Sequence, residues 1–227
     1  MIFKRTSLKN CADASGAVIV IDVLRAFSTA AYAFAAGTSQ ITLVGEVEEA
    51  FAWRERLPGA LVMGEVEGIR VPGFDFGNSP TEIDGKDLSH NVLIHRSSLG
   101  TQGAVRSVNA SWLFGASFCV AQATVRAVRR LNPDTVSFVV TGKGEDLWGD
   151  EDTACADYLE ALLLGETPPP AAYLQRVWDS PTGHIFADPL KPDFPASDLD
   201  YCTRADCFDF AMQVQRKNDR LVMTPVQ

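Results

Sequence analysis

Three polar residues near the start of the chain have the types and spacing needed to bind a metal ion and a phosphate. Asp22, Arg25 and Ser28 follow one another at intervals of three residues, directly after the apolar run 18–21. A carboxylate can hold Mg²⁺, while an arginine and the first N–H groups of a helix can hold phosphate or sulfonate oxygens. The alternative is structural: Asp22 or Ser28 caps a helix, and Arg25 lies in its solvated first turn.

A second segment, residues 73–80, reads Gly-Phe-Asp-Phe-Gly-Asn-Ser-Pro and cannot be the interior of a helix or a central strand. It predicts a rigid polar loop, the kind of segment in which binding residues concentrate. Asp75, Asn78 and Ser79, with Glu65 before them, offer the oxygen ligands that Mg²⁺ prefers. Alternatively, Asp75 and Asn78 bond to their own backbone in a tight turn.

Two further segments carry small or acidic side chains suited to binding ions. Ser98, Gly100 and Thr101 form a small-residue turn whose N–H and hydroxyl groups could bind an anion. Glu151 and Asp152 begin a predicted helix and could hold a metal ion or order water. Acidic residues also stabilise a helix start through its dipole, so a structural role is the competing interpretation.

The elements that must position these residues alternate along the chain. Short β-branched runs predict strands at 18–21, 41–44, 61–63, 92–94, 112–114 and 136–140. Periodic patterns predict helices at 24–36, 47–57, 117–131 and 151–164, and residues 179–200 read as an ordered loop. This order favours a three-layer αβα fold with a largely parallel sheet and helices on both faces. We expect one domain over 1–227, with two tightly packed lobes, 1–110 and 111–227, as the alternative.

The polar segments directly follow predicted strands. Those at the strand ends are Asp22, Glu46, Glu65, residues 95–98 and residues 141–144, which include Lys143. The carboxyl ends of parallel strands meet at one edge of a sheet, where ligands bind. The sequence therefore predicts a single site at this edge.

Composition narrows the classes of partner. A formal net charge of −9 argues against a nucleic-acid-binding or anionic-membrane surface, which would need a clustered basic face. No apolar run is long enough to span a membrane, and the first residues lack the apolar core of a signal peptide, so we expect the cytoplasm. The five widely spaced cysteines suit reduced, packed thiols. The sequence leaves open whether the chain is a monomer or a homodimer.

Together these motifs resemble the 2-phosphosulfolactate phosphatase (ComB-like) family over nearly the whole chain. The resemblance rests on Asp-Val-Leu-Arg-Ala at 22–26, Gly-Phe-Asp-x-Gly-Asn-Ser-Pro at 73–80, Gly-Thr at 100–101 and Glu-Asp-Thr at 151–153. It implies a Mg²⁺-dependent phosphatase that converts 2-phosphosulfolactate to 3-sulfolactate and phosphate, as in coenzyme M synthesis. Two family positions differ here, where Leu99 and Val120 replace asparagines, and both are expected at the rim of the site.

The residues and the resemblance together give a first mechanism. Asp22, Glu65 and Asp75 would share Mg²⁺ and, with Arg25, would be catalytic. Glu151 and Asp152 would be further metal ligands. The substrate, a small phosphorylated anion, would be bound by Arg25, Ser28, Asn78, Ser79, Ser98, Gly100 and Thr101. In a second mechanism Asp22 is a covalent nucleophile, although the second Asp that such phosphatases carry two residues on is Leu24 here. A non-catalytic, anion-binding relative of the family is the third interpretation.

Overall fold

One large sheet forms the middle layer of the structure. The computed structural model describes residues 1–142 and 149–227. In these residues the strands are β1 (Ile2–Ser7), β2 (Gly16–Ile21), β3 (Ile41–Val44), β4 (Leu61–Val66), β5 (Ile69–Arg70), β6 (Leu93–Arg96), β7 (Ala110–Ala116), β8 (Thr135–Val140), β9 (Ala211–Lys217) and β10 (Arg220–Val226). Their order across the sheet is β1-β8-β2-β7-β9-β10-β3-β6-β4-β5.

The sheet consists of two parallel blocks joined by an antiparallel hairpin. Strands β1, β8, β2 and β7 run parallel, and so do β3, β6 and β4. The hairpin β9–β10 pairs antiparallel with β7 on one side and with β3 on the other. Strands from both halves of the sequence alternate within the first block, where β8 lies between β1 and β2.

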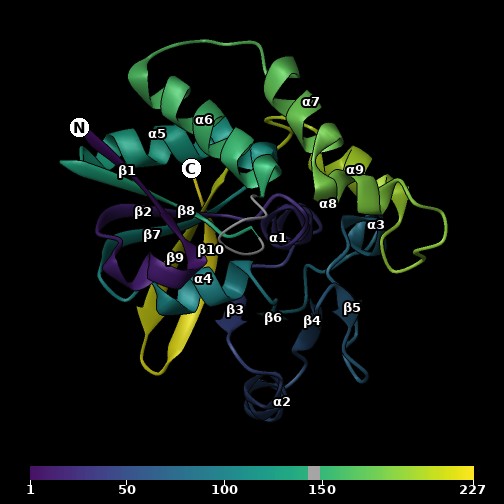
Figure 1. Cartoon of the computed structure of the whole chain (residues 1–227). Coiled ribbons are helices and arrows are strands. Elements are labelled where there is room, and N and C mark those ends of the chain that lie inside the picture. The colour runs from purple at the N-terminus through teal and green to yellow at the C-terminus, as the bar shows by residue number, and fades with distance from the viewer. Residues whose placement is uncertain (143–148) are drawn as a thin grey trace.

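Helices cover both faces of the sheet (Figure 1). In the described residues they are η1 (Leu8–Asp13), α1 (Ala26–Ala35), α2 (Val47–Arg56), α3 (Pro80–Ile83), α4 (Gly100–Arg106), η2 (Phe118–Val120), α5 (Ala121–Leu131), α6 (Asp150–Leu164), α7 (Ala171–Asp179), α8 (Pro181–Phe186) and α9 (Ala196–Cys202). This arrangement is the three-layer αβα fold that the alternation of elements predicts.

Strand β2 shows how the two core layers arise. Val18 and Val20 pack in a cluster with α1 and α4, whereas Ile19 and Ile21 pack in another cluster with α5 and α6. Because successive side chains of a strand point to opposite faces, a run of consecutive apolar residues fits a strand buried on both sides. In Figure 1, α6 and α4 accordingly lie on opposite sides of this block.

The region after residue 168 differs most from expectation. Residues 179–200, expected as a loop, contain α8 and most of α9. Ser180 caps α8 by accepting the Gly183 N–H at 2.9 Å, and Pro181 occupies the first helical position. Serine and proline are as typical of helix starts as of loops, which explains the wrong prediction.

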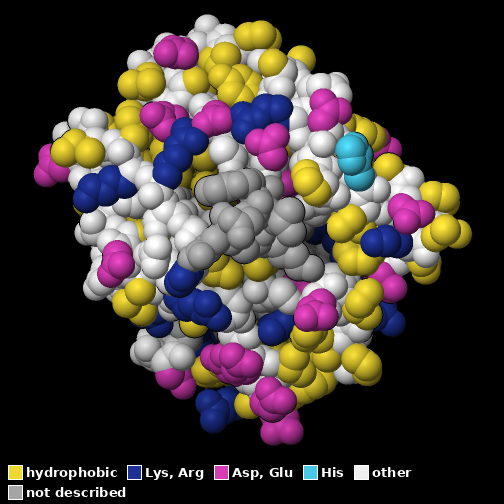
Figure 2. Space-filling model, viewed as in Figure 1, with side chains coloured by type: hydrophobic (Ala, Val, Ile, Leu, Met, Phe, Trp, Pro, Cys, Tyr) yellow, Lys and Arg dark blue, Asp and Glu magenta, His cyan; other side chains and the backbone are white. Residues whose placement is uncertain are grey.

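The surface mixes charges of both signs. On the face seen in Figure 2, basic side chains lie among acidic ones rather than in one field. None of the described helices is both long and apolar enough to cross a membrane. All five cysteines are free thiols, and only Cys207 among them is exposed.

Candidate active site

A cavity of about 290 Å³ lies at the carboxyl ends of β2, β4 and β6. It is lined by Asp22, Leu24 and Arg25 after β2, by Glu65, Glu67 and Gly68 at the β4–β5 turn, by Ser98 and Leu99 after β6, by Glu151 and Asp152 of α6, by Thr182, Ile185 and Phe186 of α8, and by Asn78 and Phe194. The structure thus brings Asp22, Glu65, Ser98, Glu151 and Asp152 together in one cavity. Glu46 is exposed and does not line it, and Lys143 lies outside the described residues.

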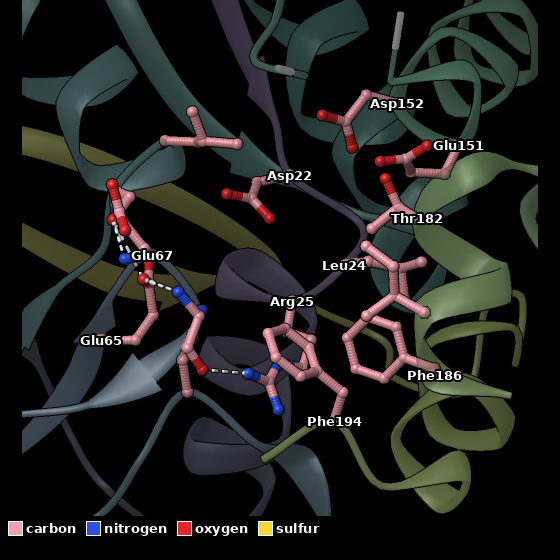
Figure 3. A pocket seen from close by; sticks show the side chains of 15 residues that line it. Asp22, Leu24, Arg25, Glu65, Glu67, Glu151, Asp152, Thr182, Phe186 and Phe194 are labelled. Carbon is pink, nitrogen blue, oxygen red and sulfur yellow. Dashed lines mark hydrogen bonds between the residues drawn. The ribbon is translucent and has the colours of Figure 1, made fainter. Parts of the chain in front are cut away.

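Asp22 occupies the middle of this cavity, with Glu65 and Glu67 on one side and Glu151 and Asp152 on the other (Figure 3). Its Oδ1 accepts the Ala26 N–H at 2.9 Å, which joins the end of β2 to the first turn of α1. Burial raises the pKa of Asp22 to about 7, and the negative charge of Glu65 also raises it. The N–H groups of Ala26 and Gly100 lower the pKa, but by less. The site therefore holds a carboxylate that is poorly solvated when ionised.

Gly100 allows this close approach of α4 to Asp22. A Cβ atom on Gly100 would lie 2.7 Å from Asp22 Oδ2, closer than real contacts allow. The sequence motif at 100–101 therefore has a steric reason: only glycine lets the first turn of α4 contact the carboxylate. Gly100 contributes its backbone N–H rather than a side chain.

Glu151 and Asp152 reach the cavity from the first turn of α6. Asp152 Oδ1 accepts the Val23 N–H at 2.7 Å, and the Thr141 hydroxyl donates to Oδ2 at 3.2 Å. Burial raises the pKa of both carboxyl groups. The negative charge of Glu151 raises the pKa of Asp152 further. Glu151 Oε2 is buried and makes no hydrogen bond within the described part of the chain. Two buried carboxylates, one with a free oxygen, are what a cation would stabilise.

Glu65 is buried beside them but is satisfied by its neighbours. Its Oε1 accepts the Ser98 N–H at 2.5 Å, and its Oε2 accepts the Gly68 N–H at 2.6 Å and the Ser98 hydroxyl at 3.0 Å. Glu65 and Ser98 thereby tie the β4–β5 turn to the segment after β6. With three donors on its two oxygens, Glu65 is better suited to shaping the cavity than to ligating a metal ion.

Arg25 lines the cavity, but its guanidinium is already paired with protein groups. Its side chain is 4% exposed and forms an ion pair with Asp198 at 2.8 Å. It also donates to the carbonyl oxygens of Gly68 and Asp193, each at 2.9 Å. Arg25 therefore joins three segments around the cavity. The carboxylate of Asp198, rather than a bound anion, offsets its charge.

Aromatic packing completes the surroundings of this arginine. Its guanidinium carbon lies 5.1 Å from the ring centroids of both Phe186 and Phe194. The two rings pack edge to face at 5.4 Å. Such contacts add cation–π attraction to the ion pair.

Three hydroxyl residues predicted to bind substrate lie outside the cavity. Ser28 donates to the Val23 carbonyl at 2.8 Å, and Thr101 donates to the Ser97 carbonyl at 2.9 Å. Ser79 caps α3 and donates to Asp198 Oδ1 at 2.7 Å. All three are buried and hydrogen-bonded to protein atoms, and Ser79 lines an adjoining cavity. Asn78 does line the cavity, and its Oδ1 lies 3.2 Å from His95 Nε2.

Asp75 is also outside the cavity, in contrast to its predicted role as a catalytic metal ligand. It forms an ion pair with Arg54 and accepts the Val62 N–H at 2.8 Å, so it fastens the 73–80 loop to β4 and α2. Of the two family departures, Leu99 lines the cavity, but Val120 is fully buried in the core rather than at the rim.

The sequence did not indicate the wall that the later part of the chain contributes. Thr182, Ile185, Phe186 and Phe194 come from a region predicted to be a loop, and Asp198 is separated from Arg25 by 173 residues. Phe194 also packs so closely on Gly68 that a Cβ there would lie 2.4 Å from its ring. In the sequence, the only sign of this close contact is Gly68 itself, a glycine next to the acidic Glu67.

The donors in the cavity fit Mg²⁺ only in part. Within residues 1–142 and 149–227, no three acidic, histidine or cysteine side chains lie close enough together to enclose a metal ion. Mg²⁺, however, commonly uses one or two carboxylates and retains several waters. Asp22, Glu151 and Asp152 supply oxygen donors of this kind, and Glu151 Oε2 has no other partner in the described residues. The predicted five-carboxylate set is thus reduced to three.

We expect metal-free protein to lose stability as the pH rises from about 4 to about 7. The folded-state pKa of Asp22 is raised from 3.8 to about 7, so between these values the folded state binds the proton more tightly than the unfolded state. Its contribution to the free energy of unfolding must then fall with increasing pH.

Thermal melts of wild type and Asp22→Asn across this range measure the effect. The melting temperature of the variant should increase relative to that of wild type as the pH rises, since its amide carries no charge. A constant difference between the two proteins would show that Asp22 does not titrate in this window.

The fold and the cavity define the class of protein: a three-layer α/β protein with an acidic ligand site at the carboxyl ends of its parallel strands. A model of the 2-phosphosulpholactate phosphatase family matches residues 3–217. The chain belongs to this family.

Three relatives illustrate the similarity. A probable 2-phosphosulfolactate phosphatase of Bacillus subtilis is 34% identical over 204 residues, 88% of each chain. Proteins described in the same words from Carboxydothermus hydrogenoformans and Synechocystis are 33% and 31% identical. The match to the Carboxydothermus hydrogenoformans protein covers 98% of this chain and 95% of the relative. The match to the Synechocystis protein covers 89% of this chain and 88% of the relative.

Proposed function

We infer that this protein is a Mg²⁺-dependent phosphatase that hydrolyses 2-phosphosulfolactate or a related small phosphorylated acid. With 2-phosphosulfolactate the products would be 3-sulfolactate and phosphate. The observation that carries this proposal is the set of three buried carboxylates, Asp22, Glu151 and Asp152, in one cavity. Family membership supports the reaction type, and the carboxylates support the metal requirement.

The three carboxylates would hold the ion, directly or through water. When bound there, Mg²⁺ supplies positive charge that offsets the charge of the phosphoryl group and activates water. Hydrolysis breaks the ester P–O bond after water attacks phosphorus, and the alcohol leaves with a proton. The amide of Asn78 lines the cavity and can donate to phosphoryl oxygens.

The residues around the carboxylates hold them in place. The Ala26 N–H fixes Asp22, and the Val23 N–H fixes Asp152, so the turn after β2 orients both. Apolar side chains at Leu24, Ile185 and Phe186 limit the access of water to the site. Fixed donors and restricted water favour electrostatic stabilisation of a transition state.

Attack by Asp22 on phosphorus remains the second mechanism. Leu24 lines the cavity at the position where such phosphatases carry their acid–base aspartate. Metal-assisted attack by water is therefore preferred. A non-catalytic anion-binding protein is the other candidate, and phosphate release from any phosphomonoester would exclude it.

Removal of divalent cations is expected to abolish phosphate release. The donors are oxygens, which favour Mg²⁺ over softer metals, and the acidic cavity cannot accept a phosphate dianion without a cation. Phosphate release from 2-phosphosulfolactate should be measured with MgCl₂, after dialysis against EDTA, and after MgCl₂ is restored. Full turnover in the EDTA-treated protein would contradict the metal requirement.

A further inference from the structure

One histidine is buried in the core next to the cavity. His95 lies on β6, opposite Leu43 of β3 and Met63 of β4, and it is fully buried. Burial lowers the pKa of His95 to about 3, so the imidazole is neutral at physiological pH. A neutral imidazole has one N–H donor and one bare acceptor nitrogen, and its partners decide which nitrogen carries the proton.

The two ring nitrogens of His95 have different surroundings. Nε2 lies 3.2 Å from Oδ1 of Asn78, an oxygen that can only accept a hydrogen bond. Nδ1 is buried and has no hydrogen-bond partner in residues 1–142 and 149–227. A buried N–H without an acceptor is less well tolerated than an unused lone pair, so the proton belongs on Nε2.

This assignment fixes the direction of the Asn78 amide. Asn78 is 5% exposed and lines both the cavity and the adjoining cavity that Arg70 also lines. Because Oδ1 faces His95, the other end of the amide, Nδ2 with its two N–H groups, remains for a ligand. With the proton on Nδ1 instead, the amide would turn and present its oxygen to the ligand, and an oxygen acceptor repels an anion.

We propose that His95 is a positioning residue whose Nε2–H holds the Asn78 amide with its N–H groups directed at the phosphoryl oxygens of the substrate. The proposal rests on the inferred phosphatase function and gives a role to a side chain that does not itself line the cavity. A donor that is held in place before the substrate binds needs no reorganisation during the reaction. Outer partners of this kind orient the residues that contact a ligand.

A double-mutant cycle tests whether the two residues act as a unit. Asn78→Ala should lower kcat/KM for 2-phosphosulfolactate with MgCl₂ by about 10–150-fold, the value of one hydrogen bond to a charged group. His95→Leu should cause a loss of the same order, because the amide can then turn. The double variant should lose no more than the worse single variant. If the two losses multiply instead, His95 acts independently of Asn78 and the proposal is overturned.

Two further variants on β6 separate positioning from packing. His95→Gln places an N–H donor near the position of Nε2 and should restore most of the kcat/KM that His95→Leu loses. Ile94→Val trims the same strand on its opposite face, in the cluster with α2, and its loss should multiply with that of Asn78→Ala. A His95→Gln protein no more active than His95→Leu would contradict the proposal. So would an Ile94→Val protein coupled to Asn78→Ala as strongly as His95→Leu is.

Nitrogen-15 NMR measures the position of the proton without any substrate. The chain contains three histidines, so the signals missing in His95→Gln identify His95. We expect a proton on Nε2 and a bare Nδ1, unchanged between about pH 5 and 8, the range in which exposed histidines titrate. A proton on Nδ1 would overturn the proposal.

Phosphate binding separates failure of this proposal from failure of the phosphatase function. If no ester releases phosphate, the inferred activity is wrong, and inorganic phosphate with MgCl₂ replaces the substrate as the probe. Phosphate should then raise the melting temperatures of wild type and His95→Gln more than those of His95→Leu and Asn78→Ala. Equal shifts in all of these proteins, including no shift, would overturn the role of His95.

Discussion

Arg25→Ala is expected to lower the free energy of unfolding by about 3–5 kcal/mol, the usual cost of breaking a buried ion pair from one side. Asp198 would remain fully buried without its cation, and the carbonyl oxygens of Gly68 and Asp193 would lose their donor. For a chain of this size the melting temperature should fall by roughly 6–20 °C. A residue that only bound substrate would instead change activity at an unchanged melting temperature.

Arg54→Ala is the matched control. Its ion pair with Asp75 is about one third exposed on both sides, and exposed pairs contribute about 0–1 kcal/mol. Melts of both variants, together with Asp198→Ala and the double variant, give the coupling energy of the buried pair. An Arg25→Ala protein that melts like wild type but has lost activity would show that Arg25 binds substrate after all.

Asp22→Asn is expected to reduce kcat/KM by roughly 10³-fold, about 4 kcal/mol of transition-state stabilisation. The same change should leave the melting temperature at pH 8 equal to or above that of wild type, because an amide avoids burying a charge that nothing in the metal-free cavity offsets. Loss of activity with gain of stability is the signature of a residue kept for chemistry. Retained activity would remove Asp22 from the mechanism.

Asp75→Asn tests whether the Asp75 carboxylate, unlike that of Asp22, is dispensable for activity. Asp75 belongs to the sequence motif that resembles the family, but its carboxylate pairs with Arg54 outside the cavity. Its kcat/KM should stay within about twofold of wild type while the melting temperature falls. A folded Asp75→Asn protein without activity would show that Asp75 itself acts in catalysis.

The covalent mechanism makes a different prediction for the same aspartate. If Asp22 attacks phosphorus, acid quenching during turnover should trap an acyl phosphate on the peptide that contains it. With direct attack by water, no phosphorylated peptide forms.

Much of the fold could be read from the sequence because its signals are local. The run 18–21 is apolar on both faces, and it becomes the central strand β2. The rule that ligands bind at strand ends marks Asp22, Glu65 and Ser98 as candidates, but it does not explain why they meet, because β4 and β6 run in the opposite direction to β2. The 41–44 strand has the predicted bounds, since the flanking Thr-Ser-Gln and Gly-Glu limit it on both sides.

The rest depends on contacts between distant segments. A polar residue type does not reveal its partner: Arg25 looks equally suited to a phosphate or to Asp198, and only the fold selects Asp198. Ser79 and Thr101 likewise look like anion donors until their hydroxyls are seen to bond within the protein. The apolar wall from α8 is hidden for the same reason, because Ile185 and Phe186 lie in a stretch rich in loop residues.

The position of the β9–β10 hairpin has a consequence for how the protein is made. These strands come after all the others in the chain, yet they lie between β7 and β3 in the middle of the sheet. If β1–β8 fold before the ribosome releases residues 211–226, the two half-sheets each expose an unpaired strand edge. Such edges pair readily with other chains. A chain that folds in this order would therefore pass through an aggregation-prone stage that ends when this hairpin pairs with β7 and β3.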